Sequence, residues 1–198
     1  MMESTGNILF SGVGGQGILL ASEITAYSLL AAGYDAKKSE VHGMAQRGGN
    51  VDTHVRIGEK VPSSLIPEGA AHFLVAFEKL EALRYMHFLR PGGTAFVCPQ
   101  EIHPLALNLR KDESYVKDVD AVLLAHAPNL VWVDAVSMAK EAGDLRMVNV
   151  ILLGALSTRL SMKEEDWEAA IRERFSAKVQ EACLASFKRG TAHVSAPV

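Results

Sequence analysis

The stretch NILFSGVGGQGI, residues 7–18, decides the fold. Residues 7–11 form an apolar run typical of a buried strand, four glycines follow, and a helical pattern begins at Ile18. This order predicts a strand, a tight turn and a helix N-terminus, where backbone N–H groups and the helix dipole can hold a phosphate or a carboxylate. We expect Gly12 to permit the turn, Gly14 the close approach of a ligand, and Gly17 the packing of helix on strand. A tight connection that binds no ligand is the alternative.

The composition is that of a globular protein with one domain. The chain has 198 residues, enough for one substantial core, and we expect a single domain over residues 1–190 with a flexible tail over 191–198. The net charge of −3 and the lack of a basic stripe with interleaved aromatic residues argue against a nucleic-acid partner. The longest strongly apolar stretch, 150–156, is too short to span a bilayer, and the first residues lack the pattern of a signal peptide. We therefore expect a cytoplasmic protein without a membrane partner.

The two cysteines limit the cofactors that this chain can hold. Cys98 and Cys183 are far apart in the sequence and no Cys-x-x-Cys pair occurs, so the chain alone cannot build a four-cysteine iron–sulfur cluster or a structural zinc site. Both are expected to be buried free thiols. The motifs G-x-S-x-G, H-E-x-x-H and a phosphate loop ending in G-K-[ST] are also absent. We therefore assign no catalytic residue and no metal ligand to the chain.

Strand and helix patterns alternate along the rest of the chain. This alternation predicts an α/β domain with a three-layer, Rossmann-like architecture, in which an open, mostly parallel sheet carries helices on both faces. Strands are expected at 7–11, 34–41, 50–57, 73–77, 94–98 and 130–133, and helices at 16–32, 78–89, 114–126, 135–142, 147–160, 164–175 and 177–188. The helix at 147–160 is apolar nearly all round, so we expect either a core helix or an apolar patch through which the isolated chain self-associates, for example as a homodimer.

A nicotinamide or flavin dinucleotide site needs more than the glycine turn. It requires a buried second strand that ends in an acidic residue about twenty residues beyond the glycines. Glu40 lies near that position, but the strand before it, residues 35–39, reads DAKKS and is polar. A central parallel strand is nearly continuously apolar, so a standard dinucleotide site is disfavoured.

A second motif, EVHGMAQRGG at residues 40–49, carries groups that bind anions or partner chains. Its three glycines release the backbone from the usual φ/ψ limits, and Arg47 supplies a planar fork suited to a phosphate or a carboxylate. Glu40, His42 and Gln46 add hydrogen-bonding groups. The pattern is equally consistent with a ligand loop and with a loop that docks on a neighbouring subunit, where Arg47 would form an interface ion pair.

Together, the two glycine motifs resemble those of the gamma subunits of the 2-oxoacid:ferredoxin oxidoreductases, and within this family those of the indolepyruvate type. Residues 51–58 and the stretch LVAFEKLEALRY at 74–85 fit the same pattern. The resemblance runs from about residue 6 to about residue 188, and two motifs at the matching separation are more specific than either alone.

The resemblance implies a subunit and not a complete enzyme. Complexes of this family decarboxylate a 2-oxoacid on thiamine diphosphate, pass electrons through iron–sulfur clusters to ferredoxin, and transfer the acyl group to coenzyme A. This chain has neither the G-D-G motif that such enzymes use for thiamine diphosphate nor cluster cysteines, so a larger catalytic partner is expected to hold both cofactors. The isolated chain is expected to be inactive, and indolepyruvate is preferred over pyruvate or 2-oxoglutarate as the substrate of the complex.

Because both glycine segments follow strands, we also expect a site at the carboxyl ends of the strands, the usual ligand crevice of open α/β sheets. We expect coenzyme A or a segment of the partner subunit to bind there, in a cleft between the two glycine segments. The residues assigned to this site are Gly12, Gly14, Gly15, Gln16, Gly17, Glu40, His42, Arg47, Gly48 and Gly49. Two other classes of function stay open: a stand-alone dinucleotide-dependent oxidoreductase, and an assembly protein whose glycine loops are docking surfaces.

Overall fold

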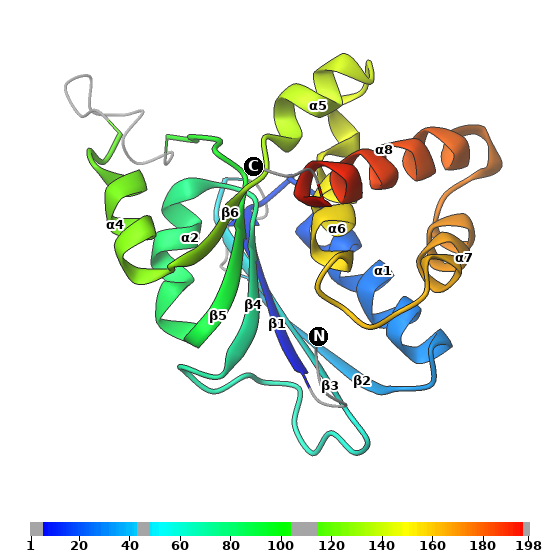
Figure 1. Cartoon of the computed structure of the whole chain (residues 1–198), viewed down its shortest axis with the longest axis horizontal. Helices are drawn as coiled ribbons and strands as arrows, with labels where there is room; N and C mark the ends of the chain where they lie inside the picture. The colour runs from blue at the N-terminus through cyan, green and yellow to red at the C-terminus, as the bar shows by residue number, and fades with distance from the viewer. Residues whose placement is uncertain (1–5, 43–47, 104–114, 196–198) are drawn as a thin grey trace.

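The computed structural model describes residues 6–42, 48–103 and 115–195 of the chain, and Figure 1 shows how the helices and strands are arranged. The strands of the sheet are β1 (Gly6–Val13), β2 (Asp35–His42), β3 (Asn50–Gly58), β4 (Ala71–Ala76), β5 (Leu89–Val97) and β6 (Asn129–Trp132). The α-helices are α1 (Ile18–Ala31), α2 (Lys79–Tyr85), α4 (Val119–His126), α5 (Ala135–Glu141), α6 (Val148–Ser157), α7 (Glu164–Arg174) and α8 (Ala177–Ser195). Two short 3-10 turns, η1 (Met86–Phe88) and η2 (Leu145–Met147), precede β5 and α6.

The sheet is mixed but mostly parallel, as the sequence predicts. Its strand order is β2-β3-β1-β4-β5-β6. Strands β1, β4, β5 and β6 pair in parallel, whereas β3 runs antiparallel to both of its neighbours, β1 and β2. The carboxyl ends of the parallel strands therefore meet at one edge of the sheet, and β3 begins at that same edge.

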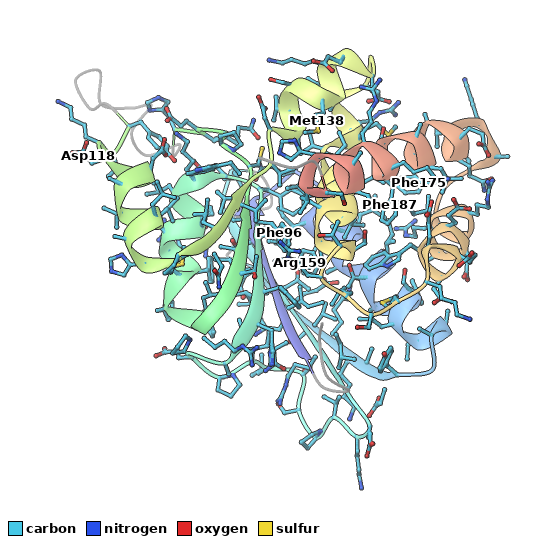
Figure 2. The ribbon with its side chains drawn as sticks, in the orientation of Figure 1. Phe96, Asp118, Met138, Arg159, Phe175 and Phe187 are labelled. Carbon is cyan, nitrogen blue, oxygen red and sulfur yellow. The ribbon has the colours of Figure 1, made fainter. Side chains whose placement is uncertain are left out.

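Helices cover both faces of the sheet, which confirms the predicted three layers. Helices α1 and α5 to α8 lie on one face, and α2 and α4 lie on the other (Figure 1). Successive residues of a strand point to opposite faces, so Ile8 and Phe10 of β1 enter the core beneath α1 while Leu9 enters the core beneath α2. In the first core, Phe96 of β5 and Phe187 of α8 pack between sheet and helices (Figure 2). The glycine turn after β1 thus leads from the sheet into the larger helical layer.

The polar strand that argued against a dinucleotide site lies at the edge of the sheet. Strand β2 pairs only with β3 among the described strands, and none of its described side chains is buried. In the dinucleotide-binding fold the strand after the first helix pairs with the first strand and is buried. Here β3 is inserted between β1 and β2, so charged residues such as Lys37 and Glu40 stay in solvent.

Helix α6 is buried on all sides within the fold itself. Every residue from Val148 to Leu156 is buried, because α6 lies between the sheet, α1, α5 and α8. Helix α8 crosses it closely at two glycines. A Cβ on Gly154 would lie 2.0 Å from the carbonyl oxygen of Phe187, and one on Gly190 would lie 1.9 Å from that of Ile151. The predicted core helix is confirmed, and the alternative of an apolar patch at 147–160 is wrong because α8 covers that surface.

The last helix is longer than the sequence pattern predicts. Helix α8 extends to Ser195, whereas residues 191–198 were expected to form a flexible tail. Thr191 donates its hydroxyl hydrogen to the carbonyl oxygen of Gly154 (3.2 Å), and the ring of His193 hydrogen-bonds to the carbonyl oxygen of Trp132 (2.9 Å). These contacts hold the end of α8 against α6 and β6, so the expectation of a tail is wrong for residues 191–195.

Candidate functional site

The turn after β1 takes its shape from glycines at positions 15 and 17. Gly15 has a φ of 104° and Gly17 a φ of 84°, left-handed backbone that favours glycine. Gly12 meets a different need, since a Cβ there would lie 2.7 Å from Oε1 of Gln16. A Cβ on Gly17 would lie 2.8 Å from Nδ2 of Asn149, so this glycine lets α1 approach α6. The turn geometry therefore depends on Gly15 and Gly17, whereas Gly12 makes room for a side chain.

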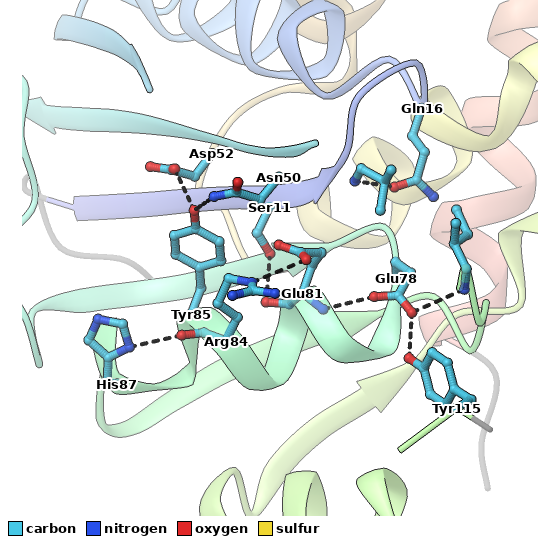
Figure 3. Close-up of polar contacts among 12 residues, drawn as sticks. Ser11, Gln16, Asn50, Asp52, Glu78, Glu81, Arg84, Tyr85, His87 and Tyr115 are labelled. Atoms are coloured by element: carbon cyan, nitrogen blue, oxygen red, sulfur yellow. Dashed lines mark hydrogen bonds and ion pairs between the residues drawn. The ribbon is translucent and has the colours of Figure 1, made fainter. Parts of the chain in front are cut away.

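Gln16 joins the ends of three neighbouring strands. Its side-chain oxygen accepts a hydrogen bond from the N–H of Val13 at 2.7 Å (Figure 3). Its amide nitrogen donates to the carbonyl oxygen of Phe77 and to Oε1 of Gln100, both at 2.9 Å. Val13 ends β1, and the other two residues follow β4 and β5. Because both amide hydrogens are used, Gln16 braces the turn, and its own backbone N–H is also occupied, by the carbonyl oxygen of Val13 at 3.2 Å.

The second glycine segment adjoins the first. The N–H of Gly14 donates to the carbonyl oxygen of Gly49 at 2.8 Å, and β3 begins one residue later. The prediction that the two segments lie together is confirmed by this contact. The same contact occupies the N–H of Gly14, so this group is not free for a ligand. Arg47 and residues 43–46 lie outside the described residues, as does the side chain of His42, and Gly48 precedes the contact with a φ of 75°.

Glu40 lies apart from the glycine turn. It occupies the edge strand β2, opposite Thr53 of β3, so that β3 separates it from β1. Its carboxylate pairs with Lys38 at 2.5 Å, and its side chain is exposed. Two strand spacings put Glu40 about 10 Å from β1. The structure therefore gives no reason to keep Glu40 with the residues of the turn.

A cavity of about 690 Å³ lies between the turn and the C-terminal helices. Gly15 and Gly17 form one wall, and α5, η2, the first turn of α6 and the start of α8 supply the others. Most of its lining is apolar, including Leu20, Val148 and Phe175. Its described lining contains neither glycine of the second segment. Among the described residues the cavity is thus formed with the first glycine segment, and the predicted cleft between both segments stays a prediction, because Arg47 lies outside the described residues.

Two cationic side chains line the cavity. Lys140 of α5 has no ion-pair partner among the described residues. Arg146 of η2 is held by Asp144, whose carboxylate lies 2.6 Å from a guanidinium nitrogen. This hydrogen bond lowers the pKa of Asp144 to about 2, so the pair is ionised at neutral pH. Lys140 is therefore the less compensated of the two charges and favours an anionic ligand.

The N-terminus of α1 adds a second source of positive potential. No side chain caps it within the described part of the chain, and its first turn contains no acidic residue. The first intrahelical hydrogen bond runs from Ala21 to Gly17, so the N–H groups of Ile18 to Leu20 have no acceptor within the helix. Free N–H groups and the helix dipole at one end favour a phosphate or a carboxylate. Leu20, Gly17 and Lys140 line the same cavity, which brings both cationic features to one place.

A buried carboxylate lies beside the brace that Gln16 forms. Glu78 caps the N-terminus of α2, where its Oε2 accepts the N–H of Glu81 at 2.8 Å (Figure 3). Its Oε1 accepts the N–H of Ile102 at 3.2 Å and a short hydrogen bond from the hydroxyl of Tyr115. Burial and this hydrogen bond raise the pKa of Tyr115 above its ordinary value. Glu78 therefore holds Ile102 and Tyr115, which precede and follow residues 104–114, at the carboxyl edge of the sheet.

A second polar cluster is buried between β3 and α2. Asp52 accepts a hydrogen bond from the hydroxyl of Tyr85 at 2.6 Å, and its other oxygen lies 3.0 Å from Nε2 of His54. Nδ1 of His54 accepts the N–H of Ile66 (3.0 Å), so the proton of a neutral His54 ring lies on Nε2 and points at Asp52. Asn50 donates its amide hydrogen to the hydroxyl of Tyr85 (3.0 Å). Burial, followed by the hydrogen bond to Asp52, raises the pKa of Tyr85, so this hydroxyl stays protonated.

Glu81 lies beside this cluster and is only partly compensated. Its Oε1 accepts a hydrogen bond from Arg84 at 3.2 Å, whereas its buried Oε2 has no hydrogen-bond partner among the described residues. Burial raises the pKa of Glu81, and the nearby guanidinium of Arg84 offsets only part of that shift. A raised pKa brings protonation of this carboxyl closer to physiological pH.

Sequence reasoning missed this polar cluster, although two signals were present. Residues 50, 52 and 54 are alternating polar positions of β3, a pattern typical of a half-buried strand. Residues 78, 81 and 85 follow at helical spacing in α2. The structure buries all of these residues except Asn50, because α2 lies over β1 and β4 and its Tyr85 reaches Asp52 of β3. Periodicity predicted which face each residue takes but not that a helix covers that face.

The described residues offer no metal site. No group of three His, Cys, Asp or Glu side chains in the described ranges could hold a metal ion. Cys98 and Cys183 are buried free thiols, as predicted, and the sulfur of Cys183 contacts that of Met147 at 3.8 Å. Burial raises the pKa of both thiols, that of Cys183 to about 11.

The helices described lack the length and apolar character that a membrane span requires.

Comparison with known proteins relates this architecture to one family. The chain matches the family model for pyruvate ferredoxin/flavodoxin oxidoreductase over residues 7–193. It is 36% identical over 188 residues to the indolepyruvate oxidoreductase subunit IorB of Thermococcus kodakarensis, with 93% of each chain covered. The gamma subunit of a keto/oxoacid ferredoxin oxidoreductase from Geobacter sulfurreducens superposes with a TM-score of 0.70 at 22% identity, covering 96% of this chain and 98% of that one. A 2-oxoglutarate:ferredoxin oxidoreductase from Magnetococcus marinus, with 2-oxoglutarate, coenzyme A and succinyl-CoA bound, gives a TM-score of 0.74 at 18% identity over all of this chain and 32% of that one.

Proposed function

The chain belongs to the pyruvate ferredoxin/flavodoxin oxidoreductase family, and we propose that it is the small subunit of an indolepyruvate ferredoxin oxidoreductase. In this role it supports the oxidative decarboxylation of an aryl 2-oxoacid to its acyl-CoA, with the electrons passed to ferredoxin. The name of the Thermococcus relative, which aligns along 93% of both chains, supports indolepyruvate over pyruvate or 2-oxoglutarate. The complex works in the cytoplasm.

Neither thiamine diphosphate nor an iron–sulfur cluster fits the described residues. A cluster needs several accessible thiolates, whereas the two cysteines here are buried and their thiols are held protonated by burial. The described residues also contain no group of three or more His, Cys, Asp or Glu side chains that could hold the metal of a diphosphate. A larger catalytic subunit therefore supplies both cofactors, and the isolated small subunit is inactive.

The cavity between the glycine turn and α5 carries the proposal for the role of this subunit. A cavity of about 690 Å³ is within the range of small-molecule sites. The N–H groups of Ile18 to Leu20 and the ammonium group of Lys140 hold the pyrophosphate of coenzyme A, and the apolar walls contact its less polar parts. The Magnetococcus structure, which shares the fold, has coenzyme A bound and supports this choice of ligand.

A stand-alone dinucleotide-dependent oxidoreductase is disfavoured. Its second strand would lie next to β1 and end at the ribose, whereas β2 is the edge strand and β3 separates it from β1. Glu40, the residue that would bind the ribose hydroxyls, pairs with Lys38 instead.

Co-expression with the large subunit tests the proposal. The complex should reduce ferredoxin with indolepyruvate and coenzyme A, and the large subunit without this chain should lose most of that activity. Reversing the charge at the cavity with Lys140→Glu should raise the KM for coenzyme A about tenfold, equivalent to about 1.4 kcal/mol of binding. The matched control is Lys60→Glu, because Lys60 is exposed and follows β3 at the opposite end of the sheet.

The two parts of the proposal fail separately. Equal activity of the large subunit with and without this chain would refute the subunit role. An unchanged KM for coenzyme A in Lys140→Glu, in a complex that still needs this chain, would refute only the assignment of the cavity.

A further inference from the structure

The edge strand β2 presents an open row of backbone hydrogen-bonding groups. In the sheet formed by the described residues it is the last strand, paired along its whole length with β3 on one side only. It spans eight residues, and none of its described side chains is buried. A long, regular edge of this kind pairs readily with another strand unless charges or bulges prevent it.

The charges on β2 favour one particular partner, a second copy of the same strand. Two copies related by a two-fold axis perpendicular to the sheet pair antiparallel and keep each face on the same side. Centred on Ser39, this pairing places Lys38 opposite Glu40 of the second copy, and Glu40 opposite Lys38 of that copy. Opposite charges directly across an antiparallel pair are stabilising. Lys38 and Glu40 already pair within each strand at 2.5 Å, and the pairing of two copies adds an opposite charge directly across from each of them.

The neighbouring registers lack this complementarity. Because both strands must turn the same face to the same side of the joined sheet, the two-fold axis passes through a residue and never between two residues. The neighbouring registers are therefore centred on Lys38 and on Glu40. Centred on Lys38, two ammonium groups face each other, and centred on Glu40, two carboxylates do so. Like charges directly opposite are destabilising. The sequence of β2 thus selects the Ser39-centred register from its neighbours.

An exposed apolar stripe on α1 borders the same edge. Lys38 reaches Glu23 of α1 at 3.7 Å, and Arg174 of α7 reaches the same carboxylate at 3.0 Å, so the face of α1 that carries Glu23 lies between β2 and α7. At 100° per residue, Leu19, Tyr27 and Leu30 lie on the same side of the helix as Glu23. Their side chains are 37%, 51% and 49% exposed. A two-fold axis through Ser39 brings this stripe toward its own copy on the same face of the joined sheet.

From these observations we infer that β2 and the adjoining stripe of α1 form the surface on which a second copy of this chain docks. The two six-stranded sheets join through β2 into one continuous sheet. The ion pairs between Lys38 and Glu40 set the register, and the apolar side chains of α1 add buried area. This surface differs from the helix at 147–160, which α8 covers.

Cysteine cross-linking tests the register directly. In the Ser39-centred pairing the two copies of residue 39 face each other, so Ser39→Cys in the full chain should form an intermolecular disulfide with oxidised glutathione. The matched control is Val41→Cys on the same strand and face, where the two copies of residue 41 lie about 13 Å apart along the strands, beyond disulfide reach. The native cysteines are buried and do not interfere. Cross-linking at residue 41 and not at residue 39 would overturn the register.

Charge reversal tests the partner. Sedimentation equilibrium should show a species of twice 21.4 kDa for the full chain. Lys38→Glu and Glu40→Lys should each raise the dimer dissociation constant about tenfold, because two cross-strand pairs turn repulsive at once. The double variant, which exchanges the charges, should restore dimerisation. A monomeric full chain at millimolar concentration, or a dimer indifferent to both single variants, would overturn the inference. Cross-linking of Ser39→Cys to the large subunit and not to a second copy would do the same.

Discussion

Because α6 and α8 cross closely, we predict that replacing Gly190 by alanine lowers the free energy of unfolding, although helix propensity alone predicts that it rises. Gly190 lies inside α8, where replacement of glycine by alanine ordinarily stabilises an exposed helix by about 1 kcal/mol. Here the added Cβ would lie 1.9 Å from the carbonyl oxygen of Ile151 and 3.1 Å from the backbone nitrogen of Ala155. Real Cβ atoms essentially never approach closer than 3.0 Å, so the two backbones must separate by more than 1 Å. No change of rotamer relieves a clash between Cβ and backbone.

The cost follows from what α6 buries. Overpacking a core costs about 1–3 kcal/mol where side chains can adjust, and the largest values arise where they cannot. Separating α8 from α6 also loosens the core around Ile151 and Phe187, which are 0% and 2% exposed and whose carbonyl oxygens lie at the crossing. Dispersion contacts weaken by a quarter to a half over a gap of about 1 Å. We expect Gly190→Ala to lose about 3 kcal/mol of unfolding free energy, a large share of the stability of a typical domain.

Urea unfolding at 25 °C, followed by circular dichroism, measures this loss. The control is Ala185→Gly on an exposed position of the same helix, which should cost about 1 kcal/mol through helix propensity alone. Gly190→Ala should therefore be less stable than Ala185→Gly although propensity ranks them the other way. If Gly190→Ala is as stable as the unaltered protein, the close crossing does not exist and the reasoning is refuted.

Three further predictions concern the Gln16 brace, the buried carboxyl of Glu81 and the two buried thiols. Gln16→Glu replaces two amide N–H donors by a carboxylate that faces two acceptor oxygens, so the variant should lose about 2–3 kcal/mol of unfolding free energy at pH 7 and recover part of it at pH 5. Equal stability of the variant at both pH values would contradict the brace. Burial raises the pKa of Glu81 above its unfolded value, so the ionised carboxylate destabilises the fold, and this penalty should shrink as the pH falls from 7 toward 5. Glu81→Gln should therefore flatten the dependence of the unfolding free energy on pH between 7 and 5, and an unchanged dependence would show that Glu81 is not its cause. Cys98 and Cys183 should resist an aromatic disulfide reagent at pH 8 in the folded protein and react in urea, because burial holds both thiols protonated. Rapid reaction of either thiol in the folded state would contradict its burial.

The sequence predicted the central architecture because local signals and burial agree there. The apolar runs of β1 and β4 are strands in the middle of the sheet, and the glycine turn leads into α1 as expected. The polar character of residues 35–39 was interpreted correctly as unfit for a dinucleotide strand. Its physical cause, an antiparallel β3 inserted next to β1, depends on strand pairing that no local pattern encodes.

The candidate site was predicted in part. The two glycine segments do adjoin, through Gly14 and Gly49, at the carboxyl edge of the sheet. Glu40 fails to join them because a residue near in the sequence lies on another strand. Lys140 and Asn149 reach the cavity from helices more than a hundred residues away, and no spacing rule connects such distant positions.

The sequence by itself determined which family the chain belongs to, where most of its strands and its first helix lie, and that its two cysteines cannot build a four-cysteine cluster. Motifs and periodicity are local properties, and local chemistry is enough to specify them. Only the tertiary structure decided that Gln16 braces three strand ends, that α8 covers α6, and that the cavity lies between the turn and α5. These features arise from contacts between residues far apart in the sequence, and their geometry exists only once the helical layer has packed on the sheet.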